Sequence, residues 1–291
     1  MSPCRALSGG CRAGRDPLST QHSAPSTSGG HLKLRQTLTL LAIVTLLASC
    51  HRGPRDYRPV VDPELARLTK EQIFERAEDQ FENKHWQRAR NYYTHLYETY
   101  PNDPLGRRSL LRIADTFYQQ GDPVNLVEAQ YKYRDFINRY PTSEQAEYAT
   151  LRIAMCSYKQ MEKPDRDQAK TREALEKFND MLRAYPKSAL RPEAEERKQE
   201  VLDRLARHEH IVAKFYMGRG SWLAAQQRLN FLIDEYPSYS GRDAVFYDLG
   251  QSLVQLGRNG EARLYFERVI TEFPKSGYAE EARRRLTGLK A

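Results

Sequence analysis

The sequence has no apolar run long enough to cross a membrane as a helix. Its longest apolar stretch covers only residues 37–47, whereas a spanning helix needs about 20 apolar residues. The chain is polar elsewhere, with a mean hydropathy of −0.77 and 29% charged residues. The sequence therefore predicts no membrane-spanning helix.

Cysteine is scarce, and the common catalytic motifs are missing. The 291 residues include only four cysteines, and we find no Cys-x-x-Cys pair, nucleophile elbow or phosphate-binding glycine loop. His208 and His210 lie about 200° apart around a helix, so they do not match an i,i+4 metal pair. We expect each to be a solvated or capping residue. The sequence thus predicts no catalytic site, no metal site and no cofactor.

The apolar stretch does have the length of a signal-peptide core. Lys33 and Arg35 provide a positive flank before it, and it ends in Leu47-Ala48-Ser49-Cys50. This ending resembles the lipobox of bacterial lipoproteins, which implies cleavage between Ser49 and Cys50 and a covalent lipid on Cys50 as membrane anchor. The alternative is an ordinary signal peptide with an incidental cysteine.

Residues 1–30 fit no signal peptide, being rich in Ser, Gly and Arg. Either the leader is extended or the true start lies further downstream, and we favour the second explanation. Residues 1–49 hold five basic residues and one acidic residue, so the remainder carries a net charge of +4, half of the total +8. Nucleic-acid binding thereby loses its main support. Residues 50–68 would form a tether. In the lipoproteins that this ending resembles, an aspartate directly after the cysteine favours retention in the inner membrane. His51 stands there instead, so the resemblance implies the periplasmic face of the outer membrane.

The rest of the chain is periodic. An aromatic-proline pair recurs with spacings of 40, 45, 51 and 37 residues, which points to a solenoid of structural repeats. The pairs are Tyr100-Pro101, Tyr140-Pro141, Tyr185-Pro186, Tyr236-Pro237 and Phe273-Pro274.

The residues before each proline follow a helical period. Twelve positions back stands alanine in all five cases, and large apolar residues stand eight and five positions back. These spacings place the residues on one face of a helix that ends before the proline. The alanines are Ala89, Ala129, Ala174, Ala225 and Ala262.

A second helix is expected ahead of each of these, as in the tetratricopeptide (TPR) pattern. The sequence predicts an all-α, right-handed superhelical solenoid of five TPR helix pairs over residues 69–274, with a short closing helix at 278–289. Repeats 1–3 occupy residues 69–186, and repeats 4–5 with the closing helix occupy residues 187–291. Thr69 with Gln72 and Asp165 with Gln168 have capping-box spacing, and Pro123 suits a first helical position.

One stretch is more specific than the general repeat pattern. Residues 202–237 read LDRLARHEHIVAKFYMGRGSWLAAQQRLNFLIDEYP, preceded by a helix that starts near Pro192. With the lipobox and five repeats, this stretch resembles the BamD family, the lipoprotein subunits of the bacterial outer-membrane β-barrel assembly machinery. The resemblance covers residues 50 to about 286.

The resemblance implies a non-catalytic role. Later repeats would bind a periplasmic domain of the barrel subunit BamA, with Arg228 at a contact position, beside other Bam lipoproteins. Early repeats would receive the carboxy-terminal signal of unfolded outer-membrane proteins, an extended segment ending in an aromatic residue. By register, a peptide groove on the first helices would include Phe74, Phe81, Arg108, Leu111, Tyr118, Tyr148 and Tyr158. The alternative for each is packing against neighbouring helices, and for Arg228 it is a plain surface arginine.

Two other functions remain open at this point. A periplasmic TPR adaptor coordinating the Tol system with peptidoglycan synthesis usually has a coiled coil and no lipid cysteine. An enzyme on a TPR scaffold would need a catalytic domain, for which the repeats leave no room. Cys156 has no partner cysteine in the mature chain, and we expect it to be a buried, inert thiol.

Overall fold

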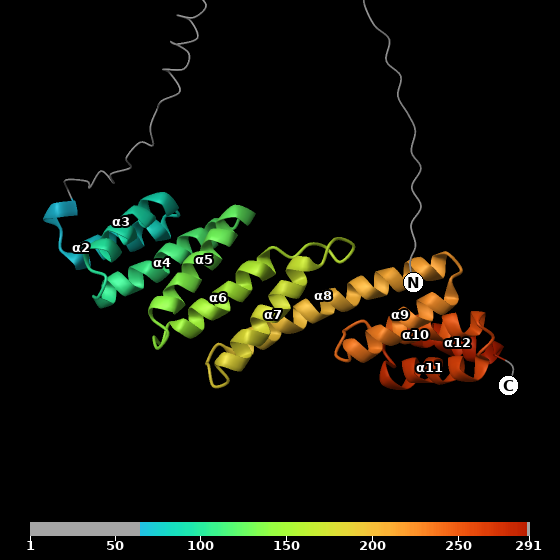
Figure 1. The fold of residues 1–291 in the computed structure, drawn as a ribbon. Coiled ribbons are helices and arrows are strands. Elements are labelled where there is room, and N and C mark those ends of the chain that lie inside the picture. The colour runs from blue at the N-terminus through green and yellow to red at the C-terminus, as the bar shows by residue number, and fades with distance from the viewer. Residues whose placement is uncertain (1–64, 290–291) are drawn as a thin grey trace, which may run out of the picture. The chain divides into compact units, whose positions relative to one another are not determined.

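The computed structural model describes residues 65–289, and all regular elements in that range are helical (Figure 1). Ser49 and Cys50 lie outside the described residues, so cleavage and lipidation stay predictions. A short 3-10 turn, η1 (Leu65–Arg67), precedes the α-helices. These are α2 (Lys70–Glu82), α3 (Trp86–Thr99), α4 (Pro104–Gln120), α5 (Pro123–Arg139), α6 (Ala146–Lys159), α7 (Ala169–Ala184), α8 (Arg191–Gly218), α9 (Trp222–Glu235), α10 (Arg242–Gln255), α11 (Asn259–Glu272) and α12 (Gly277–Gly288).

The helices form five consecutive pairs, α2/α3 to α10/α11, followed by α12. Each helix contacts the next one along the chain, and the first helices α2 and α4, like α8 and α10, also contact each other. The predicted all-α fold of five TPR helix pairs with a closing helix is confirmed. The long α8, which begins one residue before Pro192, is confirmed as well.

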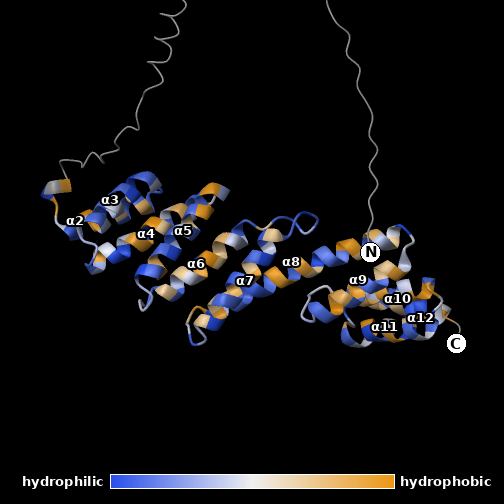
Figure 2. Ribbon diagram, viewed as in Figure 1, coloured by the Kyte–Doolittle hydropathy of each residue, from blue (hydrophilic) through white to orange (hydrophobic). Residues whose placement is uncertain are grey.

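The second helix of every pair buries the residues that the proline spacing singled out. The positions twelve, eight and five residues before each proline are 0% exposed in all five repeats. Each helix ends at the residue before the aromatic, whose backbone N–H donates to the carbonyl four residues earlier. Burying each large side chain stabilises the fold by about 1.5–3 kcal/mol. Apolar and polar residues alternate along the helices in Figure 2, as expected for amphipathic helices.

The buried residues form three clusters that follow one another along the chain. One lies among α2, α3 and α4, one runs from α4 to α8, and one runs from α8 to α12. Helix α8 joins the last two, since Val201 and Leu205 belong to one and Ala206 and Ala213 to the other. Its 28 residues therefore serve two neighbouring repeats.

Two of the three predicted helix starts are confirmed. Thr69 and Gln72 form a capping box before α2, and Asp122 caps α5 with Pro123 at its first position. The third is wrong, because α7 begins at Ala169 rather than after Asp165. Gln168 is buried, and its amide nitrogen donates to the carbonyls of Lys163 and Arg166 at 2.9 Å each. The side chain thus stabilises the preceding turn instead of capping its own helix.

Candidate functional site

Tyrosine, acid and arginine side chains from three helices form a hydrogen-bonded group that we call the first rung. The Tyr93 hydroxyl donates to Glu78 Oε1 at 2.6 Å. Arg112 donates to both oxygens of Glu78, from Nε at 2.8 Å and from Nη2 at 2.5 Å. Burial raises the pKa of Glu78, but the bonds from Arg112 and Tyr93 outweigh it and hold that pKa below its ordinary 4.5. The first rung therefore links α2, α3 and α4 through an ionised glutamate.

A second rung begins one repeat later at Asp115. Its Oδ1 accepts hydrogen bonds from the hydroxyls of Tyr133 at 2.6 Å and Tyr148 at 3.0 Å, and Oδ2 accepts one from Arg112 at 3.3 Å. Burial raises the pKa of Asp115 despite these donors. Burial, together with the Asp115 charge, raises the pKa of Tyr148 to about 12. Both carboxylate oxygens of Asp115 are thus already occupied.

The two rungs occupy equivalent positions in the repeats. The tetrapeptide Leu-Arg-Ile-Ala occurs at residues 111–114 and again at 151–154, so Arg152 is the counterpart of Arg112. Arg112 pairs with the acid of the preceding repeat, Glu78, at 2.5 Å. Arg152 makes no ion pair with Asp115, the corresponding acid. Its guanidinium lies over the rings of Tyr148 and Tyr118, 4.8 and 5.3 Å from their centroids. In the second rung, the arginine of the following repeat therefore forms no ion pair with the acid, and Asp115 pairs with Arg112 instead.

Three of the predicted groove residues are buried. Phe74, Leu111 and Tyr118 are 8%, 5% and 6% exposed. Phe74 packs edge-on against Tyr93, with ring centroids 5.8 Å apart. These three side chains stabilise the helix packing, so a peptide would meet them only at their edges.

The other predicted groove residues reach the surface to different degrees. Arg108 is exposed and lies over the Phe74 ring at 4.9 Å, while Phe81 is half-buried under Arg112 at 3.9 Å. Tyr158 is half-buried, donates its hydroxyl to Glu200, and packs edge-on against Phe178. Aromatic and arginine side chains therefore do share the first-helix side of repeats 1–3. Peptide contact by these residues stays a prediction.

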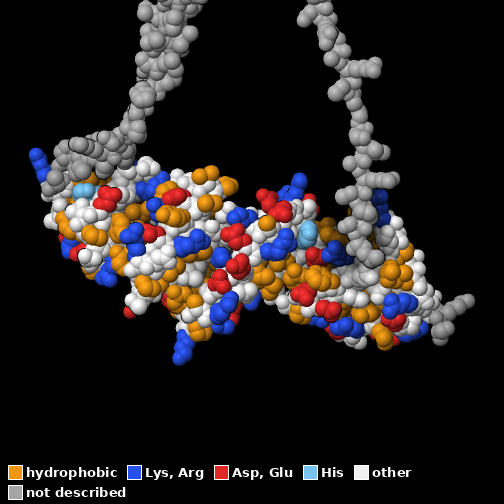
Figure 3. All heavy atoms as spheres, viewed as in Figure 1, with side chains coloured by type: hydrophobic (Ala, Val, Ile, Leu, Met, Phe, Trp, Pro, Cys, Tyr) orange, Lys and Arg blue, Asp and Glu red, His pale blue; other side chains and the backbone are white. Residues whose placement is uncertain are grey.

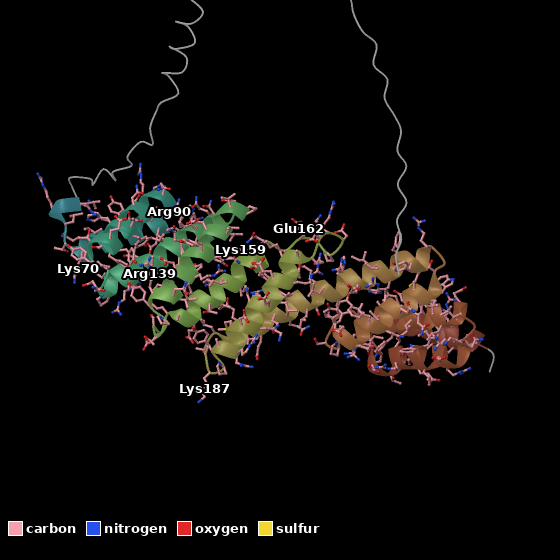
Figure 4. The ribbon with its side chains drawn as sticks, in the orientation of Figure 1. Lys70, Arg90, Arg139, Lys159, Glu162 and Lys187 are labelled. Carbon is pink, nitrogen blue, oxygen red and sulfur yellow. The ribbon has the colours of Figure 1, made fainter. Side chains whose placement is uncertain are left out.

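The repeat register did not single out three cations on the first helices of repeats 2 and 3, which are Arg112, Arg152 and Lys159. Arg112 lies four residues after Arg108, and Arg152 lies four residues after Tyr148, so the 3.6-residue period would have placed both on the same face. Lys159, at the end of α6 (Figure 4), extends over the Tyr118 ring at 3.8 Å. The repeated Leu-Arg-Ile-Ala was the signal that could have identified the arginines.

Arg228 lies exposed on α9, in the second half of the described chain. Its Nη1 is 3.1 Å from Glu209 Oε2 on α8. The pair is only partly exposed, with side-chain exposures of 46% for Arg228 and 17% for Glu209. Its predicted role in partner binding stays a prediction.

An open hollow of about 470 Å³ lies at the turn between α8 and α9. Two large apolar side chains near this turn are exposed, Phe215 at 57% and Leu223 at 58%. The sequence reasoning did not single out this surface. The hollow is lined by Gly220, Ser221, Trp222, Leu223, Ala224, Gln227 and Leu256.

The expectation of a solvated or capping His210 is wrong. Its side chain is buried, and Nε2 lies 2.7 Å from Asp248 Oδ2 on α10. The contact between α8 and α10 brings these residues together across 38 positions of sequence. His208 Nδ1 lies 2.7 Å from the Pro164 carbonyl oxygen, next to the turn before α7.

Cys156 is fully buried and free, as predicted, and burial raises the pKa of its thiol to about 12. Between residues 65 and 289, no group of three His, Cys, Asp or Glu side chains is placed to hold a metal ion. No helix in that range has the length and apolarity that a membrane span requires. On the face shown in Figure 3, basic and acidic side chains are interspersed.

Comparison with known proteins identifies the family. Residues 66–263 match the family YfiO, outer membrane lipoprotein. The chain belongs to this family. Outer membrane protein assembly factor BamD of Caulobacter vibrioides is 27% identical over 66% of this chain and 62% of its own length, less than two thirds of that protein. The BamD proteins of Rickettsia prowazekii (24% identity, 87% of this chain, 97% of that protein) and Xylella fastidiosa (24%, 75% of each) are also similar.

The predicted resemblance to BamD-type lipoproteins is thereby confirmed for this YfiO family member. Among solved structures, the TPR2AB domain of yeast Sti1 aligns at 14% identity over 72% of this chain and 80% of that chain. Its TM-score of 0.41 is too low to support any inference about binding.

Proposed function

We propose that this protein is a non-catalytic, lipid-anchored subunit of an outer-membrane β-barrel assembly (Bam) complex, on the periplasmic face of the outer membrane. It would bind a BamA-like barrel subunit, beside other Bam lipoproteins, and receive the carboxy-terminal signals of unfolded outer-membrane proteins. The observation that carries the proposal is the family match over residues 66–263, together with relatives named outer membrane protein assembly factor BamD. No cofactor is needed, because insertion would run on the folding free energy of the client.

The surface around α8 and α9 supports the BamA contact. It presents an exposed arginine, Arg228, and the exposed apolar side chains Phe215 and Leu223 near an open hollow. Arginine and aromatic residues are enriched where protein interfaces bury most of their binding energy. A folded periplasmic domain with an acidic side chain facing Arg228 would fit this surface.

The first-helix side of repeats 1–3 supports the reception of clients. Arg108, Tyr148 and Tyr158 present cationic and aromatic atoms there. An extended segment that ends in an aromatic residue and a carboxylate has complementary chemistry.

The proposal is tested by purifying the detergent-solubilised protein from its native envelope and identifying the co-purifying proteins by mass spectrometry. We expect a large barrel protein with periplasmic repeat domains, and we expect Arg228→Glu to reduce its recovery. Arg183→Glu, which changes an arginine with a 76% exposed side chain on α7, is the matched control and should leave recovery unchanged. Recovery of Tol or peptidoglycan-synthesis proteins without a barrel subunit would refute the Bam role. A lipid-modified peptide beginning at Cys50 would establish the anchor.

A further inference from the structure

The connection between α6 and α7, residues 160–168, is longer than the connections inside the other helix pairs. It has nine residues, whereas the turns inside the other four pairs have two or three. Figure 1 shows it standing out beyond the ends of both helices. Ordering a long connection costs conformational entropy, and long connections in compact domains often have a function of their own. We call this segment the α6–α7 loop.

Side chains hold the loop against the middle of α8. Arg204 Nη1 donates to the carbonyl oxygen of Glu162 at 2.7 Å, and His208 Nδ1 donates to that of Pro164, also at 2.7 Å. The two donors are four residues apart and so lie on one face of α8. The buried Gln168 amide donates to two further carbonyls from the end of the loop itself. Four loop carbonyls therefore accept hydrogen bonds from side chains, which fixes the backbone on α8.

The loop presents charged side chains on this fixed backbone. Five of its side chains are charged, all five are exposed, and none forms an ion pair with another residue between 65 and 289. A surface that is ordered before binding loses less entropy when a partner arrives, so this arrangement suits recognition. The signs alternate along the chain, in the order Glu162, Lys163, Asp165, Arg166 and Asp167.

The loop lies beside the surface that the proposed function assigns to the barrel subunit. Glu209, which follows His208 on α8, pairs with Arg228 of α9 at 3.1 Å. Burial raises the pKa of Tyr236 at the end of α9, the Glu209 charge raises it further, and Arg172 of α7 lowers it. The start of α7, the middle of α8 and the second half of α9 therefore lie close together. An interface of standard size is about 30 Å across, so a domain seated on Arg228 is large enough to reach the loop.

The chemistry of the loop favours a folded protein over a membrane or an extended peptide. Anionic lipid surfaces attract clusters of lysine and arginine, whereas this loop has three acids and two bases. Extended peptides bind at sheet edges or in apolar and aromatic grooves, but the loop protrudes and contains no aromatic residue. Charges of both signs instead set orientation and partner choice between two folded surfaces.

We propose that the α6–α7 loop is a second contact for the folded periplasmic domain that binds beside Arg228, and that the facing surface of this domain carries both acidic and basic side chains. This inference rests on the proposed function, which supplies the domain. It extends the contact from repeat 4 into repeat 3. Arg204 and His208 are positioning residues, because they hold the loop backbone in place for the contact.

The test measures binding of the purified periplasmic domains of the BamA-like subunit to the full lipoprotein in detergent, by biolayer interferometry. Lys163→Glu combined with Arg166→Glu should weaken binding at least about tenfold, because like charges would then face each other. Lys187→Glu combined with Arg183→Glu is the matched control and should leave the affinity unchanged. It makes the same change of charge at the other end of α7, where Figure 4 shows Lys187 far from Glu162.

Reversing the acids identifies the kind of surface that the loop meets. Glu162→Lys combined with Asp165→Lys should also weaken binding about tenfold, because a surface with both signs loses favourable contacts in either case. Tighter binding by this variant would show attraction to a uniformly acidic surface and would overturn the proposed contact.

Arg204→Ala combined with His208→Ala tests the positioning role, since it removes two donors and keeps every loop charge. Hydrogen exchange of residues 161–167 should become faster, and the affinity should fall several-fold. Faster exchange with unchanged affinity would overturn the positioning role.

The outcomes separate this inference from the proposed function. If wild type does not bind the periplasmic domains, the proposed function is refuted. If wild type binds and Arg228→Glu weakens binding, but both loop charge reversals bind like wild type, only the loop contact is overturned. Thermal unfolding of each variant shows whether a lost affinity reflects a lost fold, and a variant that melts like wild type gives a direct reading of the contact.

Discussion

Gly106 provides a sharp test of how α4 is positioned. An alanine Cβ at this site would lie 1.9 Å from the carbonyl oxygen of Tyr100 and 2.8 Å from its carbonyl carbon. Both atoms are backbone, so no side-chain rotation relieves the overlap. Reaching 3.0 Å, the lower limit for real Cβ contacts, would require a shift of 1.1 Å. The first turn of α4 would have to move away from the end of α3.

The expected cost of Gly106→Ala follows from two opposing effects. Replacing glycine by alanine within a helix normally stabilises it by about 1 kcal/mol. Overpacking a buried site normally costs about 1–3 kcal/mol and sometimes more, and contact with rigid backbone belongs at the upper end. We therefore expect the free energy of unfolding to fall by roughly 2 kcal/mol. Because α4 carries Arg112 and Asp115, both rungs should be perturbed as well.

Urea denaturation followed by circular dichroism measures this change, with Gly260→Ala as the matched control. A Cβ at Gly260, in the first turn of α11, would meet nothing within 4 Å, so that variant should be neutral or up to about 1 kcal/mol more stable. The reasoning about α4 is refuted if Gly106→Ala is as stable as Gly260→Ala.

Asp115→Ala should lower the free energy of unfolding by about 3 kcal/mol in urea melts, because Tyr133 and Arg112 lose a buried acceptor; equal stability would show the rung to be dispensable. Cys156 should react with a thiol reagent only after denaturation, since it is 0% exposed and its pKa is raised to about 12; rapid labelling of the native protein would contradict its burial. The pKa of Glu78 is lowered from 4.5 in the fold, so its stabilising effect is complete above pH 4.5 and is lost as pH falls through the lower folded value. The stability difference between wild type and Glu78→Gln, followed by urea melts at decreasing pH, should therefore shrink under acid conditions; a constant difference would refute this.

The sequence was most informative where a residue's environment depends on its own helix. Ala89, Tyr93 and Leu96 could be assigned to the core because helix period and proline position fix which face is buried, and all three are 0% exposed. The pairing of His210 with Asp248 depends instead on how two first helices pack across 38 residues. No local pattern carries that information, and the prediction for His210 failed there.

The predicted groove residues also depend on how neighbouring helices pack. Register assigned aromatic and arginine side chains to the first helices, but register cannot separate a side chain at a helix contact from one at the surface. Leu111 and Tyr118 are consequently buried, whereas Arg108 is exposed. How deeply each of these side chains is buried depends on the neighbouring helix.

The two arginines of the repeated Leu-Arg-Ile-Ala differ in their acidic partners, since Arg112 pairs with Glu78 and Arg152 lies over two tyrosine rings. The acid before Arg112 is Glu78, whose longer side chain reaches the next repeat and closes the first rung. The corresponding acid before Arg152 is Asp115, which is shorter by about 1.5 Å, and two tyrosines and Arg112 occupy its oxygens. Identical Leu-Arg-Ile-Ala segments therefore produce a neutralised arginine in one repeat and an unpaired one in the next. In this solenoid the motif fixes where the arginine stands, and the side chains that already bind the preceding acid are the difference that separates the two ion-pairing patterns.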